Sequence, residues 1–255
     1  MSESKENKIL LEIKNLVVEV GGKRLLRGVD MIVREGETHV VFGPNGSGKT
    51  TLVNAVMGLP EYKVVGGDII FKGNSVLGWN LTDRAKAGIG LAFQHPPVVE
   101  GVSLGVLLKT IVPDEKTSGE IAKKAGMEDY LEREVNVGFS GGERKKDELL
   151  QLLAQAPQLV MFDEPDSGVD VDSIKLMVVL MRRLLQKDKP IRERKNSGII
   201  VTHSGVILEE IHADKGYVLV NGKLLCSGPP LDIFDQVKNY GFERCIKEAN
   251  ESEKK

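Results

Sequence analysis

Residues 43–50 read Gly43-Pro44-Asn45-Gly46-Ser47-Gly48-Lys49-Thr50 and fit the pattern G-x-x-x-x-G-K-[ST]. The glycines let backbone N–H groups come close to a diphosphate, because bulky side chains would block that approach. The apolar run at 38–42 predicts a buried strand before the loop, and 49–57 predicts a helix after it. Such a helix directs its N-terminal dipole and unpaired N–H groups at an anion. The strand, loop and helix together disfavour a chance match in a glycine-rich chain.

The end of this phosphate loop (residues 43–50) carries the charged and hydroxyl side chains. We expect the Lys49 amine to lie between the β- and γ-phosphates of a nucleotide and the Thr50 hydroxyl to reach Mg²⁺. A bound nucleotide is then expected to contact the loop and the residue after it: Gly43, Pro44, Asn45, Gly46, Ser47, Gly48, Lys49, Thr50 and Thr51.

A second strand, at 159–162, ends in two carboxylates, Asp163 and Glu164. In a parallel sheet the carboxyl ends of the strands open onto the ligand crevice. Asp163 is placed there to hold Mg²⁺ through its water, and Glu164 to polarise an attacking water. A solvated acidic turn is the alternative, and the phosphate loop in the same chain favours the metal and water roles.

The stretch Ser140-Gly141-Gly142-Glu143 predicts a second helix N-terminus suited to phosphate. Ser140 and Glu143 form an S-x-x-E capping box, and the two glycines expose backbone N–H groups in the first turn. We call residues 140–143 the second cradle, because the phosphate loop already gives the chain one helix N-terminus that can bind phosphate. One nucleotide needs only one such helix N-terminus in each chain. This second one therefore suggests contact with the γ-phosphate of a nucleotide held by another copy, with a plain helix cap as the alternative.

Composition excludes several classes of protein. The chain has 255 residues, 35 Lys and Arg against 37 Asp and Glu, and 5% aromatic residues, which disfavours a nucleic-acid coat. It has 4 histidines and 2 cysteines, Cys226 and Cys245, without metal-ligand spacing, so we expect two reduced thiols and no cluster site. The near-neutral charge and the few aromatic residues indicate no nucleic-acid partner. The polar start MSESKENK and the lack of a long apolar run indicate a cytoplasmic protein with no membrane insertion.

The order of predicted elements indicates an α/β protein with a mainly parallel sheet. Strand signals occupy the first 97 residues and return at 159, whereas helical periods and charge pairs dominate from about 98 to 156. Asn221-Gly222 between two apolar runs predicts a tight hairpin. The charged ends of the chain, 1–8 and 247–255, are expected to be flexible.

At this point the residues resemble a known family. The order of the phosphate loop, Gln94, Ser140–Glu143, Asp163-Glu164, Ser167–Asp170 and His203 is similar to that of the ATP-binding cassette (ABC) family over residues 9–240. The resemblance implies a P-loop NTPase fold, the ABC nucleotide-binding domain. Its α/β core and antiparallel β subdomain would span about 9–97 and 157–240, with an inserted helical subdomain at about 98–156.

The resemblance also implies an ATP hydrolase with ATP and Mg²⁺ as cofactors. Gln94 would touch Mg²⁺ and the attacking water, and His203 would contact the γ-phosphate. Two copies would close transiently on ATP, with Asp170 at their seam and Ser140, Gly141 and Gly142 of each copy reaching the nucleotide of the other. The catalytic set would be Glu164, His203, Lys49 and Gln94, and the metal set Thr50, Gln94 and Asp163.

One position departs from the family pattern. Many cassettes stack the adenine on an aromatic residue in the first hairpin, and the matching position here is Val20. Without that stacking, selectivity for adenine and tight nucleotide binding are in doubt.

Three groups of cassette are candidates: transport ATPases, repair or chromosome ATPases, and the ATPases of the SUF system of iron–sulfur cluster assembly. The second group carries a long coiled coil, and no sustained heptads occur here. The stretch 135–151 and the residues around Gln94 resemble the SUF ATPases. This resemblance implies SufB-like and possibly SufD-like scaffold partners docking at about 95–130. The ATPase subunit of a membrane transporter is the alternative.

Two lysines follow the second cradle, Lys145 and Lys146. One hypothesis is that either pairs with Glu164 or Asp166 and restrains the resting site. A solvated basic patch is the favoured alternative, since exposed ion pairs are weak.

Overall fold

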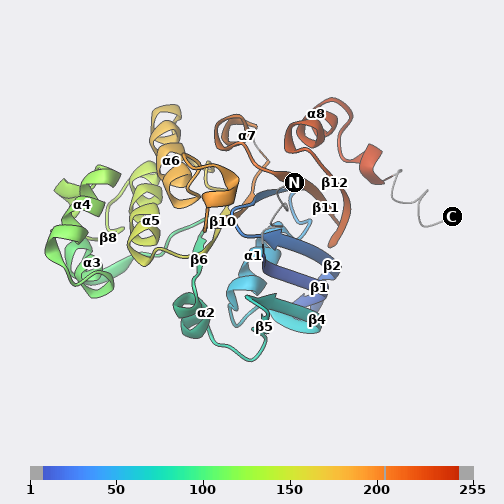
Figure 1. Cartoon of the computed structure of the whole chain (residues 1–255), viewed down its shortest axis with the longest axis horizontal. Coiled ribbons are helices and arrows are strands. Elements are labelled where there is room, and N and C mark those ends of the chain that lie inside the picture. The colour runs from blue at the N-terminus through green and yellow to red at the C-terminus, as the bar shows by residue number, and fades with distance from the viewer. Residues whose placement is uncertain (1–7, 204, 247–255) are drawn as a thin grey trace, which may run out of the picture.

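The computed structural model describes residues 8–203 and 205–246. Apart from Lys8, the termini expected to be flexible, 1–8 and 247–255, lie outside the described residues. The described part contains two main sheets, with helices packed around them (Figure 1).

The larger sheet has six strands in the order β12-β11-β3-β10-β9-β6. From β11 to β6 all neighbours are parallel, and only the edge strand β12 runs antiparallel, so the expectation of a mainly parallel sheet is confirmed. The three central strands are buried along their whole length, as parallel strands covered on both faces require. The bounds are β3 Thr38–Phe42, β6 Ile89–Ala92, β9 Leu159–Asp163, β10 Ser197–Val201, β11 Lys215–Val220 and β12 Lys223–Gly228.

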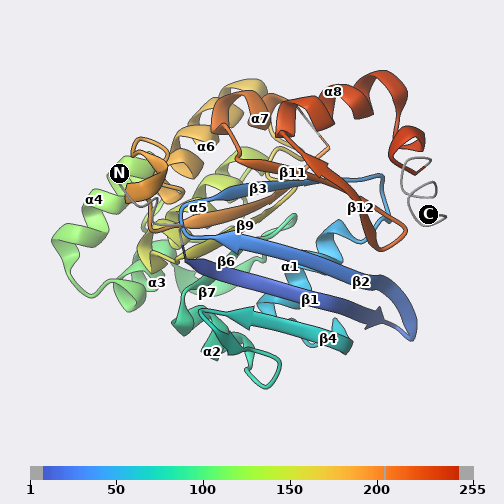
Figure 2. The ribbon, with the colours of Figure 1, turned by 45° about the vertical axis from the view of Figure 1, so that its right-hand side comes forward.

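The second sheet is antiparallel, with the order β2-β1-β4-β5. Its strands are β1 Ile9–Val20, β2 Lys23–Arg34, β4 Lys63–Phe71 and β5 Asn74–Ser75. Figure 2 shows β1, β2 and β4 together with α1 on one side of the parallel sheet, and α6, α7 and α8 on the other.

The helices fall into groups around the sheets. α3, α4 and α5 gather at one end of the molecule with the short pair β7 and β8 (Figure 1). The helix bounds are α1 Lys49–Met57, α2 Leu81–Ala87, α3 Leu104–Ile111, α4 Glu115–Ala125, α5 Gly141–Gln155, α6 Val171–Leu184, α7 Val206–Ile211 and α8 Pro230–Tyr240. The remaining elements are β7 Val99–Ser103, β8 Glu134–Val135 and the 3₁₀ helices Glu128–Tyr130 and Ile191–Glu193.

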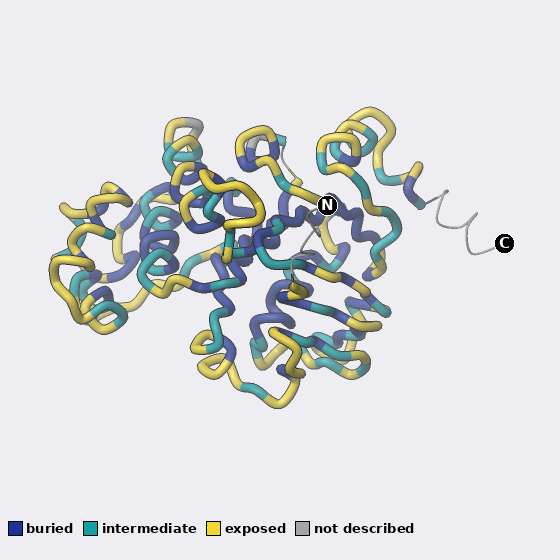
Figure 3. Tube along the Cα trace, viewed as in Figure 1, coloured by how far each residue is buried: buried dark blue, intermediate teal, exposed yellow. Residues whose placement is uncertain are grey.

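The parallel sheet divides the core into two clusters. Alternate residues of one strand point to opposite faces, so Val40 and Phe42 of β3 pack with α5, α6 and α7, whereas Val41 packs with α1 and the antiparallel sheet. β9 behaves in the same way, with Phe162 in the first cluster and Met161 in the second. Figure 3 shows these buried strands running through the middle of the molecule. The sheet is thus fixed from both faces, and its carboxyl edge is held in place.

The predicted Asn221-Gly222 hairpin is present, and it supports the phosphate loop. Both residues have positive φ, 51° and 79°, as a tight two-residue turn requires. The Gly222 N–H donates to the Ser47 carbonyl (3.0 Å), and the Gly222 carbonyl accepts from the Arg27 N–H (2.9 Å). A Cβ at Gly222 would lie 2.2 Å from the Leu25 carbonyl oxygen, so only glycine allows this contact.

Candidate nucleotide-binding site

The phosphate loop leaves β3 and enters α1, as the sequence predicts. α1 begins at Lys49, and its N-cap Gly48 (φ 109°) provides no side chain to satisfy the first N–H groups of the helix. A Cβ at Gly48 would lie 2.8 Å from Leu26, so the left-handed, close-packed cap requires glycine. The Lys49 amine donates to the carbonyls of Gly43 (2.9 Å) and Pro44 (3.2 Å) across the loop. Unsatisfied N–H groups at a helix start, beside a buried cation, suit an anion such as phosphate.

Thr50 and Asp163 lie side by side below the loop. The Thr50 hydroxyl donates to Oδ1 of Asp163 (3.1 Å), although the two residues are 113 positions apart. Asp163 ends β9 and is 2% exposed, and its burial raises the pKa of the carboxyl while the hydrogen bond from Thr50 lowers it. A hydroxyl and a carboxylate in contact are hard oxygen donors of the kind that Mg²⁺ binds, so these residues fit the ion.

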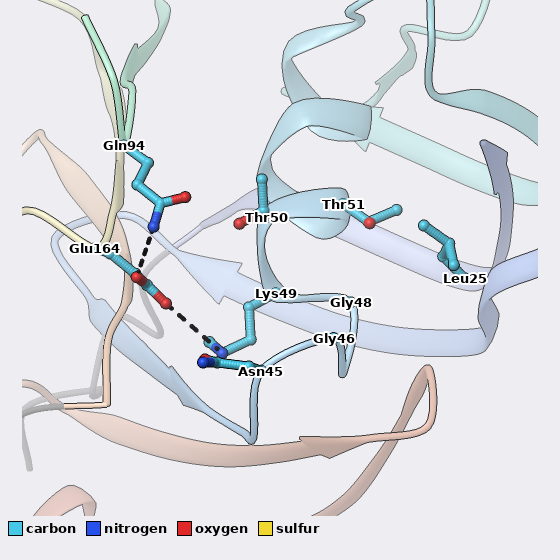
Figure 4. A pocket seen from close by; sticks show the side chains of 9 residues that line it. All are labelled: Leu25, Asn45, Gly46, Gly48, Lys49, Thr50, Thr51, Gln94 and Glu164. Atoms are coloured by element: carbon cyan, nitrogen blue, oxygen red, sulfur yellow. Dashed lines mark hydrogen bonds and ion pairs between the residues drawn. The ribbon is translucent and has the colours of Figure 1, made fainter. Parts of the chain in front are cut away.

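The Glu164 carboxylate contacts side chains from several segments of the site (Figure 4). Its Oε2 accepts a hydrogen bond from Nε2 of Gln94 (2.8 Å), and its Oε1 lies 3.8 Å from the Lys49 amine. Nδ1 of His203 lies 3.6 Å from the same Oε1, and the His203 side chain is 59% exposed. The structure therefore brings together all four residues expected to be catalytic. Glu164 itself adopts φ 45°, which is strained for a non-glycine residue.

A pocket of about 350 Å³ opens at this cluster. Its lining joins the phosphate loop and α1 to the Gln94 and Glu164 side chains (Figure 4). Thr51 lines the pocket as expected, and so does Leu25 of β2, which the sequence reasoning missed. Leu25 rather than Val20 is the hairpin residue at this pocket, and no aromatic side chain occurs among its described lining residues.

The second cradle, residues 140–143, forms the capped start of α5 and does not line the pocket. Ser140 caps α5 by accepting from the Glu143 N–H (3.3 Å), and Glu143 accepts from the Ser140 N–H (2.7 Å), which confirms the capping box. A Cβ at Gly141 would lie 2.6 Å from the Gly168 carbonyl oxygen, so the start of α5 packs on the segment before α6. Asp170 caps α6 by accepting from the Ser173 N–H (2.9 Å). Ser140, Gly141, Gly142 and Asp170 thus do not line the pocket of their own chain.

A buried clamp on Phe93 holds the segment that carries Gln94. The Phe93 N–H donates to Oε1 of Glu148 (2.5 Å), and the Lys145 amine donates to the Phe93 carbonyl (2.5 Å). Lys145 is 4% and Glu148 7% exposed, and burial is the largest cause that raises the pKa of Glu148 to about 8 and lowers that of Lys145. No local pattern in the sequence predicts this role for Glu148.

The clamp is the direct contact of Lys145: its amine bonds to the Phe93 carbonyl, and the described ion pairs of Glu164 are those with Lys49 and His203. The charges of Asp166 and Glu164 still act on Lys145 and raise its pKa against the larger effect of burial. The restraint of the resting site by Lys145 or Lys146 therefore stays a prediction, whereas a solvated basic patch is wrong for Lys145, because that side chain is buried.

Comparison with known proteins assigns the class to which this fold and site belong. The family model described as "ABC transporter" matches residues 26–167. The chain therefore belongs to the ABC transporter family, as an ATP-binding cassette that binds nucleotide and hydrolyses ATP. It is 38% identical over 249 residues to the "Probable ATP-dependent transporter SufC" of Escherichia coli K12, covering 91% of this chain and 97% of that protein. It is 35% identical over 241 residues to the "Probable ATP-dependent transporter ycf16" of Cyanophora paradoxa, covering 88% and 90%.

Solved structures agree on the fold. A nucleotide-free ATP-binding cassette from an ABC transporter superposes with a TM-score of 0.76 at 22% identity, covering 93% of this chain and 98% of that one. An ATP-binding cassette in its ADP conformation gives 0.75 at 22% identity, covering 94% and 99%. The expected ABC nucleotide-binding fold is therefore confirmed. In the described part of the chain, no helix has both the length and the apolar character that crossing a membrane demands.

We expect Glu148→Gln to reduce the pH dependence of stability, to which Asp147, with its pKa raised to about 6, also contributes. Folding raises the pKa of Glu148 from an ordinary 4.5 to about 8, so between these values the folded chain holds a proton that the unfolded chain releases. The free energy of unfolding should therefore fall as pH rises through this window, by up to about 1.4 kcal/mol per pH unit. Glutamine can still accept from the Phe93 N–H but does not titrate.

Urea unfolding from pH 5 to 8 measures this slope, with the exposed Glu132→Gln as the matched control. The Glu132 variant should keep the slope of the natural chain. Equal slopes for Glu148→Gln and the natural chain would contradict the assignment.

Proposed function

We propose that the cluster around Glu164 carries out the hydrolysis of ATP. The observation that supports this most directly is the convergence of Lys49, Gln94 and His203 on one carboxylate at the mouth of the phosphate loop. The loop and α1 would hold the β- and γ-phosphates, and Thr51 would add a contact behind them. Thr50, Asp163 and Gln94 would hold Mg²⁺, which supplies charge neutralisation at the phosphates.

In this proposal Glu164 is the group that polarises water. The hydrogen bond from Gln94 fixes one carboxylate oxygen, and the other faces Lys49 and His203. A carboxylate so oriented can accept a proton from a water aimed at the γ-phosphate. His203 is exposed enough to contact that phosphate, and Lys49 balances its charge.

We further propose that the working unit is a transient dimer formed on ATP. The start of α5, with Ser140 and Gly141 exposed, lies away from the pocket of its own chain, and its helix N-terminus would suit a phosphate. A second copy facing the first would bring its Ser140, Gly141 and Gly142 to the nucleotide, with the Asp170 segments at the seam. This arrangement gives each cradle an anion to bind.

The partners that we propose are SUF scaffold proteins, SufB-like and possibly SufD-like, in the cytoplasm, without nucleic acid and without membrane insertion. The name SufC of the Escherichia coli relative and the match over nearly its whole length support this. The proposed docking surface is a groove of about 140 Å³ beside the Gln94 segment. Its lining comes from the residues just before position 98 and from the proposed helical subdomain at about 98–156. It is lined by Pro96, Pro97, Val99 and Leu107, and also by Phe93 and Glu148.

Glu148 connects this groove to the nucleotide-binding site. Its carboxylate lines the groove and also accepts from the Phe93 N–H, one residue before Gln94. A partner that enters the groove would shift α5 and the Gln94 segment together, and hydrolysis would move the partner in return. The output of the ATPase is thus proposed to be a conformational change in the scaffold.

Glu164→Gln is expected to keep ATP binding within a few-fold and to slow hydrolysis by about 100-fold or more, since it removes only the proton acceptor. Phosphate release and binding of a fluorescent ATP analogue measure the two effects. Glu209→Gln, an exposed acid on α7, is the matched control and should leave both unchanged. Near-normal turnover by the Glu164 variant would rule out the proposed role.

Mixing two inactive variants tests the composite site. Lys49→Ala removes the phosphate-loop cation and Ser140→Arg blocks the second cradle, so each alone should be inactive. In an equimolar mixture half of the dimers pair one variant with the other, and each such dimer has one intact site. Phosphate release should then recover to roughly a quarter of the normal rate. No recovery at any protein concentration would speak against shared sites.

Val99→Asp tests the docking surface, because it places a charge in an apolar groove. Affinity purification of the natural chain from cytosol and membrane fractions should recover soluble scaffold proteins, and the Val99 variant should lose them. Val65→Asp on β4, 48% exposed, is the matched control and should retain them. Recovery of integral membrane proteins instead would favour the transporter subunit.

A further inference from the structure

The two cysteines of the chain meet in the fold. Cys226 lies in the edge strand β12, opposite Val218 of β11, and Cys245 follows α8. Their Sγ atoms are 2.8 Å apart, although 19 positions separate them in the sequence. The sequence predicts two reduced thiols and does not indicate that they meet. A bonded pair would close to about 2.05 Å, a movement of less than 1 Å from this position.

The two thiols differ in access. Cys245 is 1% exposed and belongs to the same buried cluster as Val218 and Ile233. Cys226 is half-buried on a strand at the edge of the sheet. Cys226 is therefore the more accessible of the two residues to a molecule from solvent.

We propose that Cys226 and Cys245 form a reversible intramolecular disulfide by exchange with a low-molecular-weight disulfide such as oxidised glutathione. The Cys226 thiolate attacks one sulfur of that disulfide, which breaks its S–S bond and releases one thiol. The Cys245 thiolate then attacks the Cys226 sulfur and displaces the second thiol. The two cysteines lose two electrons and two protons, and the external disulfide is reduced to two thiols.

The bond would fasten α8 to the sheet. The closed loop runs from β12 through α8, and Phe234 of α8 packs against the Phe42 ring with centroids 6.0 Å apart. Phe42 is the residue before the phosphate loop. A Cβ at Gly205, two residues after His203, would lie 2.4 Å from the Phe234 ring, so α8 also covers this segment. The disulfide thus restrains a helix that contacts both Phe42, the residue before the loop, and Gly205.

Mass spectrometry of the natural chain at stepped ratios of reduced to oxidised glutathione tests the proposal. As the oxidised form increases, the chain should lose two hydrogen atoms and both of its thiols together, and reduction should reverse the change. Because a cross-link over this loop restricts the unfolded chain, the oxidised protein should melt roughly 5 °C higher.

Two single variants separate the roles of the thiols. Cys245→Ser should accumulate one glutathione on Cys226, because the second attack is absent, whereas Cys226→Ser should react slowly because Cys245 is buried. Neither variant should gain melting temperature on oxidation. A natural chain that stays a dithiol at full oxidation, or that links only between chains on a non-reducing gel, would overturn the proposal.

Discussion

The register of the parallel strands is the constraint on which the site depends. β9 and β10 pair so that Asp163 lies opposite Val201, and β3 pairs so that Val41 lies opposite the same residue. Each strand therefore ends at one edge, where the phosphate loop, Asp163-Glu164 and the segment of His203 emerge side by side. A slip of one residue would turn every side chain of a strand to the other face, and both core clusters oppose it. The chemistry is thus positioned by aliphatic packing several residues away from it.

α5 connects the separate parts of the molecule. Its N-cap is the exposed Ser140, its middle holds the Phe93 peptide through Lys145 and Glu148, and Glu148, Gln151, Leu152 and Gln155 line the groove. Burying two ionisable side chains is costly for their charged forms, which is why burial raises the pKa of Glu148 and lowers that of Lys145, and the two hydrogen bonds to one peptide offset part of that cost. Such a contact fixes geometry more than it adds stability. Because both hydrogen bonds come from α5, a shift of that helix would also shift the segment that carries Gln94.

Much of this could be read from the sequence where the signal is local. The helix at 49–57, the strand at 38–42, the capping box and the Asn-Gly hairpin depend on backbone preferences within a few residues, and the structure confirms them. Contacts between distant segments were not readable. Nothing near Glu148 indicates that it will meet Phe93, nothing near Cys226 points to Cys245, and nothing near Leu25 indicates that it will line the pocket. Gln94 and His203 entered only through resemblance to a family.

The backbone of Glu164 has a consequence for how this site can vary. Its left-handed φ of 45° costs about 1–3 kcal/mol for an ordinary residue, whereas glycine or asparagine adopts it readily. The side chain that the proposed chemistry needs is therefore one that the local conformation disfavours. Backbone preference and the proposed catalytic role therefore favour different residues at this position. Selection for thermostability alone would tend to replace Glu164 and remove the proposed ATPase activity.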